Sequence, residues 1–329
     1  MWLSDEALRH LREVADLPDL SGTPYDIVEA IGRGGMGTVY LAHDRDLDRE
    51  VAVKVIQLPE EDGELSERML REARILARLE HPGIVPVHDV GTLPDGRVFY
   101  VMKRVRGSRL DEHAPTASLP ERLRIFQRIC EAVAFAHAHG VIHRDLKPEN
   151  VMVGTFGEVL VMDWGVAKIL TPRPPLLPGL RPAHTPQPGE GEKTGREERG
   201  VTGHGTILGT PGYMAPEQAR GEVERIDERT DVYALGAILS FLLAREQPAP
   251  RPLESIRRRA MAEEPDGRYP NVGELAEDLS RYLAGMAVLA HREGLLERTG
   301  RFVRRYRTPI LLILAYLLMR TILLFVFGR

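Results

Sequence analysis

The stretch His143-Arg144-Asp145-Leu146-Lys147-Pro148-Glu149-Asn150 places three chemically distinct groups on one short segment. Asp145 can act as a base, Lys147 is a cation, and Asn150 carries an amide oxygen that can bind a metal ion. Phosphoryl transfer from a nucleotide needs these three groups close together. The base orients a hydroxyl, the cation neutralises the moving phosphoryl group, and the amide helps to hold magnesium. The segment therefore predicts phosphoryl-transfer chemistry.

Composition sets the outer limits of this interpretation. The chain has 329 residues, which is enough for one large domain or two medium ones with a sizeable core. The formal net charge of -4 gives no electrostatic argument for nucleic-acid binding, so we expect no nucleic-acid partner. The single cysteine, Cys130, lies in an apolar helical pattern, which favours buried packing over a catalytic thiol.

Five regions follow one another along the sequence. An amphipathic helix with acidic residues, unlike a signal peptide, is expected over 1–20. Residues 25–285 form a body that a Pro-rich, charged insertion interrupts at 171–200. We expect this insertion to be disordered, either as a tolerated surface loop or as a regulatory segment. A basic linker over 286–308 leads to an almost wholly apolar run at 309–327.

The body changes from strand patterns to helix patterns along its length. Strands are expected at 25–31, 38–41, 51–56, 84–90 and 98–102, and helices at 65–79, 121–139, 231–244, 253–262 and 272–283. Strands first and helices later predict an α+β protein. It would have a small sheet lobe over about 25–103 and a larger helical lobe over about 107–285.

A glycine-rich stretch lies between the first two predicted strands. Gly32, Gly34, Gly35 and Gly37 follow the spacing G-x-G-x-x-G and precede Val39. Glycines let backbone amides approach phosphate oxygens without side-chain obstruction. A tight hairpin or a dinucleotide-binding fingerprint would look similar, but a strand rather than a helix follows here, which argues against the dinucleotide site.

Taken together, these motifs closely resemble the bacterial membrane-anchored Ser/Thr protein kinases of the eukaryotic-like superfamily. The resemblance covers about residues 25–285 and implies a bilobal protein-kinase fold. Residues 143–150 match H-R-D-L-x-x-x-N, and residues 51–54 are similar to the V-A-I-K strand. Asp163-Trp164-Gly165 resembles D-F-G with Trp in place of Phe, and Ala215-Pro216-Glu217 matches A-P-E.

The resemblance implies roles for the ATP and magnesium machinery. Lys54 would hold the α- and β-phosphates of ATP, paired with Glu72 on the next helix; Glu64 and Glu67 are weaker candidates for that partner. Asn150 and Asp163 would hold Mg²⁺.

The resemblance also implies roles for the reacting groups. Asp145 would orient and deprotonate the acceptor hydroxyl, and Lys147 would stabilise charge on the transferring group. Thr210 would bridge these two residues through its hydroxyl. Lys147 is similar to Ser/Thr-specific members of the superfamily, so protein Ser and Thr hydroxyls are the expected acceptors.

Further residues take positions implied by the same resemblance. Val39 and Ala52 would line the adenine pocket, Met102 resembles the gatekeeper, and the backbone of Val105 would meet adenine. The carboxylate of Asp231 would hold the catalytic loop.

The activation segment and the second lobe carry further expectations. Glu217 would pair with Arg268. Arg144 implies control by phosphorylation of the activation segment, with Thr202 and Thr206, and less so Thr194, as autophosphorylation sites and a homodimer as one route to it. Only a short Pro-rich link at 247–252 stands where a docking helix usually occurs in such kinases, which puts substrate recruitment in doubt.

The apolar run at 309–327 predicts a transmembrane helix, since about 20 apolar residues cross a bilayer. Arg320 within it costs about 2.5–3.5 kcal/mol at the bilayer centre, and the apolar residues contribute about -4.5 to -9 kcal/mol. The arginines of the preceding linker predict a single-pass cell-membrane protein with its kinase domain in the cytoplasm. A helix lying on the membrane surface is the alternative.

Two rival functions differ from the kinase prediction. A pseudokinase scaffold would bind nucleotide without turnover, but it predicts the loss of a catalytic group and none is missing from the motifs. A kinase of small molecules is less consistent with residues 209–217, which resemble a segment shaped for peptide substrates.

Overall fold

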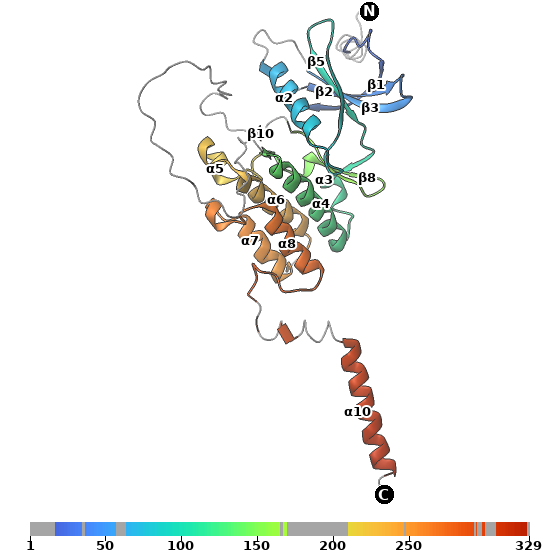
Figure 1. Ribbon diagram of the computed structural model, residues 1–329, viewed down its shortest axis with the longest axis vertical. Coiled ribbons are helices and arrows are strands. Elements are labelled where there is room, and N and C mark those ends of the chain that lie inside the picture. The colour runs from blue at the N-terminus through green and yellow to red at the C-terminus, as the bar shows by residue number, and fades with distance from the viewer. Residues whose placement is uncertain are drawn as a thin grey trace, which may run out of the picture.

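The computed structural model describes residues 17–34, 37–56, 64–164, 167–169, 210–246, 248–292, 294, 298–299 and 307–327. Several sequence predictions lie outside these ranges: most of the N-terminal helix, the insertion at 171–200, most of the basic linker, Gly35, and the threonines Thr194, Thr202 and Thr206. The described residues form a strand-rich lobe and a helix-rich lobe, as Figure 1 shows.

The N-terminal lobe is built on one antiparallel five-stranded sheet of order β1-β2-β3-β5-β4. Its strands are β1 (Tyr25–Gly34), β2 (Gly37–Asp44), β3 (Arg49–Val55), β4 (Val87–Thr92) and β5 (Val98–Lys103). β3 and β5 lie inside the sheet and are buried along most of their length, which fits their Val-rich sequences. Their register places Lys54 directly opposite Tyr100.

Helix α2 (Glu64–Arg78) contacts β4 and β5 of this sheet. Its buried residues recur at helical spacing (Met69, Ala73, Leu76), so the helix has one apolar face. Glu72 lies on the same buried side and is 1% exposed. A carboxylate placed there needs a partner inside the protein.

The fourth strand starts later than the sequence predicts. A strand was expected over 84–90, whereas β4 begins at Val87. Pro86 has no N–H to donate to a ladder, which explains the later start. Ile84 instead forms an isolated parallel bridge with Val161, a residue of the other lobe.

The C-terminal lobe is mainly helical. Its helices are α3 (Leu110–His113), α4 (Leu119–Ala138), α5 (Pro216–Ala219), α6 (Glu228–Leu243), α7 (Arg251–Ala260) and α8 (Val272–Leu283). Asp227 caps α6 by accepting from the Arg229 amide, and Asn271 caps α8 by accepting from the Glu274 amide. The longer helices α4, α6, α7 and α8 match the predicted ones to within a few residues, whereas the short α3 and α5 were not predicted.

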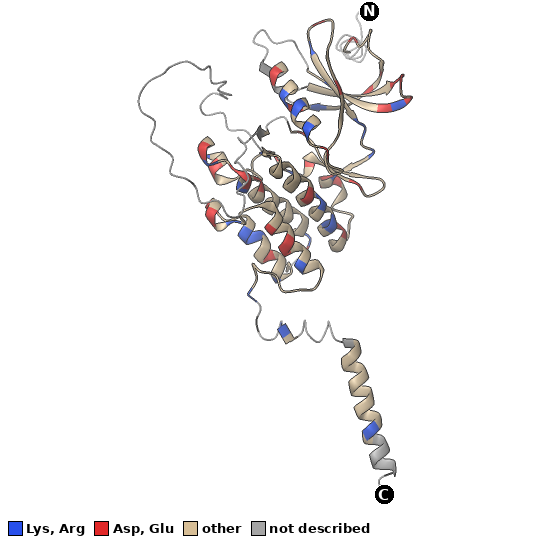
Figure 2. Cartoon of the chain, in the orientation of Figure 1, with Lys and Arg blue, Asp and Glu red and all other residues tan. Residues whose placement is uncertain are grey.

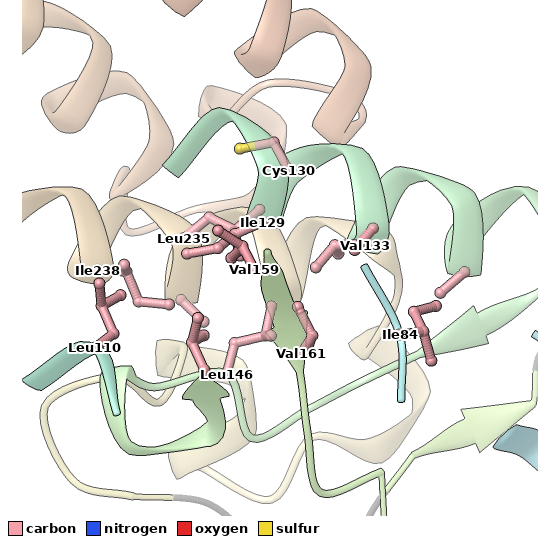
Figure 3. Close-up of a cluster of buried hydrophobic side chains, with 14 of the residues drawn as sticks. Ile84, Leu110, Ile129, Cys130, Val133, Leu146, Val159, Val161, Leu235 and Ile238 are labelled. Atoms are coloured by element: carbon pink, nitrogen blue, oxygen red, sulfur yellow. The ribbon is translucent and has the colours of Figure 1, made fainter. Parts of the chain in front are cut away.

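The core of this lobe lies between α4, α6 and a short hairpin. Figure 3 shows Ile129, Cys130 and Val133 of α4 close to Leu235 of α6 and to Val159 and Val161 of the hairpin. Cys130 is fully buried, and burial raises the pKa of its thiol, so its role is packing as the sequence predicted.

Short strands flank the segment that carries Asp145. A three-stranded sheet contains β6 (Gly107–Arg109), β8 (Val151–Gly154) and β9 (Val159–Val161), and β7 (Val141–Ile142) pairs with β10 (Lys168–Ile169). Short 3-10 helices occur at Pro148–Asn150, Val223–Arg225 and Pro265–Gly267. The first of these turns Asn150 back toward Asp145.

The connection between α6 and α7 is short. Among its described residues, 244–246 and 248–250, there is no helix, in agreement with the sequence prediction. Arg122 of α4 holds this connection, because its guanidinium donates to the Leu242 carbonyl and, at 2.5 Å, to the Glu246 carboxylate.

The last described element is α10 (Arg307–Phe327). Its apolar side chains from Leu311 to Met319 are exposed, and Figure 2 shows one basic band among the residues of the helix that it colours. Within the described part of the chain, no helix is both long and apolar enough to cross a membrane. The predicted transmembrane helix is therefore not confirmed.

Candidate active site

A cavity of about 450 Å³ lies between the two lobes. One wall comes from β1, β2, β3, β5 and α2, and the other from the segments around Asp145 and Asp163. The lining residues are Gly32, Arg33, Gly37, Val39, Lys54, Glu72, Leu76, Val85, Tyr100, Met102, Asp145, Glu149, Asn150, Met162 and Asp163. The cavity is thus apolar on part of its wall and strongly charged at one end.

Lys54 is held at the charged end by two carboxylates. Its ammonium Nζ lies 2.9 Å from Oε2 and 3.1 Å from Oε1 of Glu72, so the predicted ion pair is present. The same Nζ lies 3.5 Å from Oδ1 of Asp163. Residues distant in sequence therefore meet at one cation.

Burial and charge act in opposite directions on Lys54. Burial, the largest single influence, would lower the pKa of this ammonium, but its acidic surroundings, Glu72 foremost and Asp163 with it, together outweigh burial. The net pKa is raised, so Lys54 keeps its proton throughout the physiological range and can bind a polyphosphate as a fixed cation.

Asp145 shares its carboxylate between two donors. Lys147 Nζ lies 2.9 Å from Oδ2 of Asp145, and the Thr210 hydroxyl donates to Oδ1 at 3.1 Å. Lys147 in turn donates to the Thr210 hydroxyl oxygen at 2.7 Å. The predicted bridge through Thr210 is present, and it links the segment at 143–150 to the described residues that follow the insertion.

Asn150 is oriented by Asp145. Its amide nitrogen donates to the Asp145 carbonyl at 2.9 Å and to the carboxylate Oδ2 at 3.2 Å. The amide oxygen is therefore the atom with which Asn150 can ligate a cation. Asp163 lines the same cavity and supplies a carboxylate, so both predicted metal-binding residues offer oxygen, the donor that Mg²⁺ prefers.

A buried carboxylate on α6 fixes the backbone of the Asp145 segment. Asp231 accepts hydrogen bonds from the amides of His143 at 2.8 Å and Arg144 at 2.9 Å, and its Oδ2 lies 2.7 Å from His137 Nε2. Burial alone would raise the pKa of Asp231, but the hydrogen bond to His137, together with smaller effects that include the Arg144 amide, outweighs it and the net pKa is lowered. The predicted role of Asp231 in holding the loop is confirmed, whereas His137 was not foreseen.

The backbone at the site is strained. Three described residues other than glycine have a left-handed φ, and two of them are Arg144 at 71° and Asp163 at 58°. Such conformations cost about 1–3 kcal/mol each and persist where the surroundings impose them. Trp164 helps to hold the backbone of the adjacent Asp163 in this conformation, because its side chain is fully buried. Its ring centre lies 4.6 Å from that of His143, and its indole N–H donates to the Val161 carbonyl.

Glycine is required at one position of the predicted phosphate loop. A Cβ on Gly37 would lie 2.2 Å from the Val55 carbonyl oxygen, and its φ is 156°. Gly32 and Gly37 both line the cavity, and Gly34 ends β1. Two of the described glycines of the predicted phosphate loop therefore form part of the cavity wall.

The predicted nucleotide contacts agree with the cavity only in part. Val39 and Met102 line it, but Ala52 and Val105 do not. Ala52 is buried and pairs with Met102 across strands β3 and β5. Of these two residues, Met102 lines the cavity.

Tyr100 is the most informative lining residue that sequence reasoning missed. No motif includes it, and its position beside Lys54 follows from the strand register, which the sequence did not reveal.

The last predicted pair lies away from the cavity. Arg268 binds both carboxylate oxygens of Glu217, at 2.7 and 2.8 Å, with both side chains fully buried. Thr230 donates to the same carboxylate at 3.1 Å. The predicted pair is present and ties the described residues after the insertion to the helical lobe.

Comparisons with known proteins agree with this geometry. The protein kinase domain family model matches residues 25–288. Among curated relatives, the Ser/Thr-protein kinase PknD of Protochlamydia amoebophila is 33% identical over 79% of this chain and 30% of its own length. PknD of Chlamydia muridarum is 35% identical over 88% of this chain and 34% of its own length.

The curated relatives are much longer, since this chain spans about a third of their length. Among solved structures, the PknI kinase domain of Mycobacterium tuberculosis matches with a TM-score of 0.57 and 25% identity, covering 80% of this chain and 96% of that one. The family match covers most of the chain and includes every segment that lines the cavity. The chain belongs to the protein kinase domain family.

Proposed function

We propose that this chain is a Ser/Thr protein kinase that transfers the γ-phosphate of ATP to Ser and Thr hydroxyls of proteins. One observation carries the proposal: Lys54, Glu72, Asp145, Asn150 and Asp163 all line a single cavity between the lobes. They come from separate strands, helices and loops, and together they supply a fixed cation, a base and two oxygen ligands. Positioning and charge neutralisation are what phosphoryl transfer requires of a protein.

In the proposed mechanism Asp145 orients and deprotonates the acceptor hydroxyl. Lys147, 2.9 Å from that carboxylate, neutralises charge that develops on the transferring group. The Thr210 hydroxyl holds both side chains in place. Lys54, kept cationic by Glu72, positions the α- and β-phosphates of the nucleotide.

Asp163 and Asn150 fit a magnesium ion. Both offer oxygen donors, and such a site is completed by nucleotide phosphates and waters, so a cluster of three carboxylates is not required. Within the described residues there is no group of three or more His, Cys, Asp or Glu side chains that could hold a metal alone. Magnesium would neutralise phosphate charge during transfer.

The direct test compares Asp145→Asn with the unaltered chain in transfer of labelled γ-phosphate from ATP and magnesium to casein. General-base catalysis contributes about 10²–10⁴-fold, so we expect a loss of that size with nucleotide binding retained. Asp46→Asn, in an exposed turn after β2, is the matched control and should transfer at the normal rate. Normal transfer by Asp145→Asn would reject the assignment.

The alternative of a pseudokinase scaffold gives a different result. It predicts that ATP and magnesium raise the melting temperature of the unaltered chain while no phosphate reaches casein or the chain itself. The site keeps each catalytic group named above, which favours turnover.

Regulation and location extend the proposal. Autophosphorylation at Thr202 or Thr206, with a transient homodimer, would be identified by mass spectrometry after incubation with ATP and magnesium. Attachment to the cell membrane through residues 309–327, with the kinase domain on the cytoplasmic side, is supported by the apolar sequence of that run and by the arginines before it.

A further inference from the structure

The Glu72 carboxylate has a second buried donor besides Lys54. The Tyr100 hydroxyl donates to Oε1 of Glu72 at 2.9 Å, and Lys54 reaches the same oxygen at 3.1 Å. All three side chains are buried, with Glu72 1% and Tyr100 2% exposed. A hydrogen bond between a phenol and an ionised carboxylate in such surroundings is among the stronger neutral-to-charged contacts.

Tyr100 belongs to the sheet of the lobe and not to α2, the helix that carries Glu72. It lies on β5, an inner strand of the sheet, directly opposite Lys54 on β3. Lys54 Nζ lies 5.6 Å from the centre of the Tyr100 ring. The sheet therefore presents a cation and a hydroxyl side by side to a carboxylate carried by a separate helix.

The demands on Lys54 explain why a second donor matters. Lys54 already lies between Glu72 and Asp163, and in the proposed function it also binds nucleotide phosphates. Because these acidic groups share one ammonium, each of them weakens the interaction of Lys54 with the other two. If Lys54 alone held Glu72, a shift toward phosphate would loosen the contact that keeps α2 against the sheet.

Resting on the proposed kinase function, we propose that Tyr100 is a positioning residue that holds Glu72 inward against the sheet while Lys54 engages the nucleotide. It acts through Glu72 and touches neither the acceptor nor the transferring group. Burial, and then the charge of Glu72, raise the pKa of the Tyr100 phenol, so its hydroxyl remains a donor at any pH at which the protein works.

The test removes the hydroxyl and little else. In full-length Tyr100→Phe we expect kcat/KM for ATP to fall about tenfold, the loss that corresponds to about 1.4 kcal/mol. KM for casein should change less than about twofold, because the acceptor side of the site is intact. Tyr100→Met, which also lacks the hydroxyl and is flexible enough to fill the space, serves as a second variant if Phe impairs folding.

The matched control is Tyr25→Phe. Tyr25 is also a buried sheet tyrosine, and its hydroxyl donates to the Asp89 carboxylate at 3.0 Å, but it belongs to the other hydrophobic cluster of the lobe and does not line the cavity. This variant should keep the normal kcat/KM for ATP, even if both phenylalanine variants lose similar thermal stability.

A double-mutant cycle separates positioning from packing. In a Glu72→Gln background the Tyr100→Phe change should cost less than about twofold, because the partner through which Tyr100 acts has lost its charge. An equal loss in both backgrounds, or normal kinetics for both Tyr100 variants, would overturn the inference. The Asp145→Asn variant is measured alongside. If the unaltered chain transfers phosphate and Asp145→Asn does not, the kinase function is supported. Normal kinetics of the Tyr100 variants would then reject only the role proposed for Tyr100.

Discussion

Two buried ion pairs of this protein serve different purposes, and exposure to the cavity separates them. The Lys54–Glu72 pair borders the cavity in which the proposed function places the nucleotide. The Arg268–Glu217 pair is sealed, with both side chains fully buried and two parallel hydrogen bonds. Buried pairs are costly to break because removal of one charge leaves the other without compensation.

We therefore predict that Glu217→Gln lowers the free energy of unfolding by about 3–5 kcal/mol. Urea titration followed by circular dichroism measures the change. Glu224→Gln, an exposed substitution in the 3-10 helix Val223–Arg225, is the control and should stay within about 0.5 kcal/mol of the unaltered chain. An equally small effect of Glu217→Gln would contradict the structural role of the pair.

The same residue gives the pH dependence of stability. Burial alone would raise the pKa of Glu217, but hydrogen bonds from Arg268 and Thr230 outweigh it, so the folded pKa lies below the ordinary value of 4.5. As the pH falls below about 4.5, the unfolded chain takes up the proton first and stability is lost. The Glu217→Gln variant should lose less of its remaining stability over that acid range.

For single residues, the sequence predicted the site roles of side chains that belong to motifs. It missed side chains whose position depends on strand register or helix packing. Lys54, Glu72 and Asp163 were assigned from the motifs and their spacing, and they meet as expected. Tyr100 and His137 lie outside the motifs quoted above. Their partners are brought to them by strand pairing and helix packing, which one sequence does not specify.

At the scale of elements, the short connection after α6 is the main departure from the fold expected for the family. Arg122 compensates for part of it, because its buried guanidinium satisfies the Leu242 carbonyl at the end of α6 and binds Glu246. The last carbonyls of a helix lack intrahelical partners, so an arginine there acts as a cap supplied by another helix.

We predict that Arg122→Ala lowers the free energy of unfolding by about 2–3 kcal/mol, since it removes charged hydrogen bonds and leaves a buried carbonyl unsatisfied. Thermal and urea unfolding of the full chain measure this. Arg124→Ala, on the exposed side of the same helix, removes a similar side chain and should change stability by less than about 0.5 kcal/mol. Equal changes in the free energy of unfolding for the two substitutions would show that Arg122 does not stabilise the end of α6.

Element types were easier to predict than their edges. The four longer helices of the second lobe, α4, α6, α7 and α8, were found from apolar periodicity, which strong burial of one face enforces. The start of β4 was wrong by three residues, because Pro86 interrupts the ladder inside an otherwise β-prone run. The pairing of β7 with β10 was not predicted, since two-residue strands leave no periodicity.

At the scale of the whole molecule, α10 differs from every other long helix that the structure describes. Its leucines from position 311 to 318 are between 48% and 67% exposed, and Arg320 is the one charge among its described side chains. An apolar surface of this kind marks a site of association rather than a face left in water.

We predict that deletion of residues 309–327 moves the protein from the membrane fraction to the supernatant of a cell lysate. Extraction with alkaline carbonate followed by immunoblotting measures the distribution. The full-length Asp145→Asn variant should partition like the unaltered chain, because location does not depend on turnover. If the unaltered and truncated chains both remain in the supernatant, the proposed attachment through residues 309–327 is wrong.

Trp164 gives the site a built-in optical reporter. The chain contains two tryptophans, Trp2 and Trp164, and the second is fully buried against the His143 ring. With Trp2 replaced by Phe, fluorescence would arise from this one indole, directly after Asp163. A blue-shifted emission would then accompany the arrangement described above, and a shift to longer wavelength would follow in real time any turn of Asp163 away from Lys54.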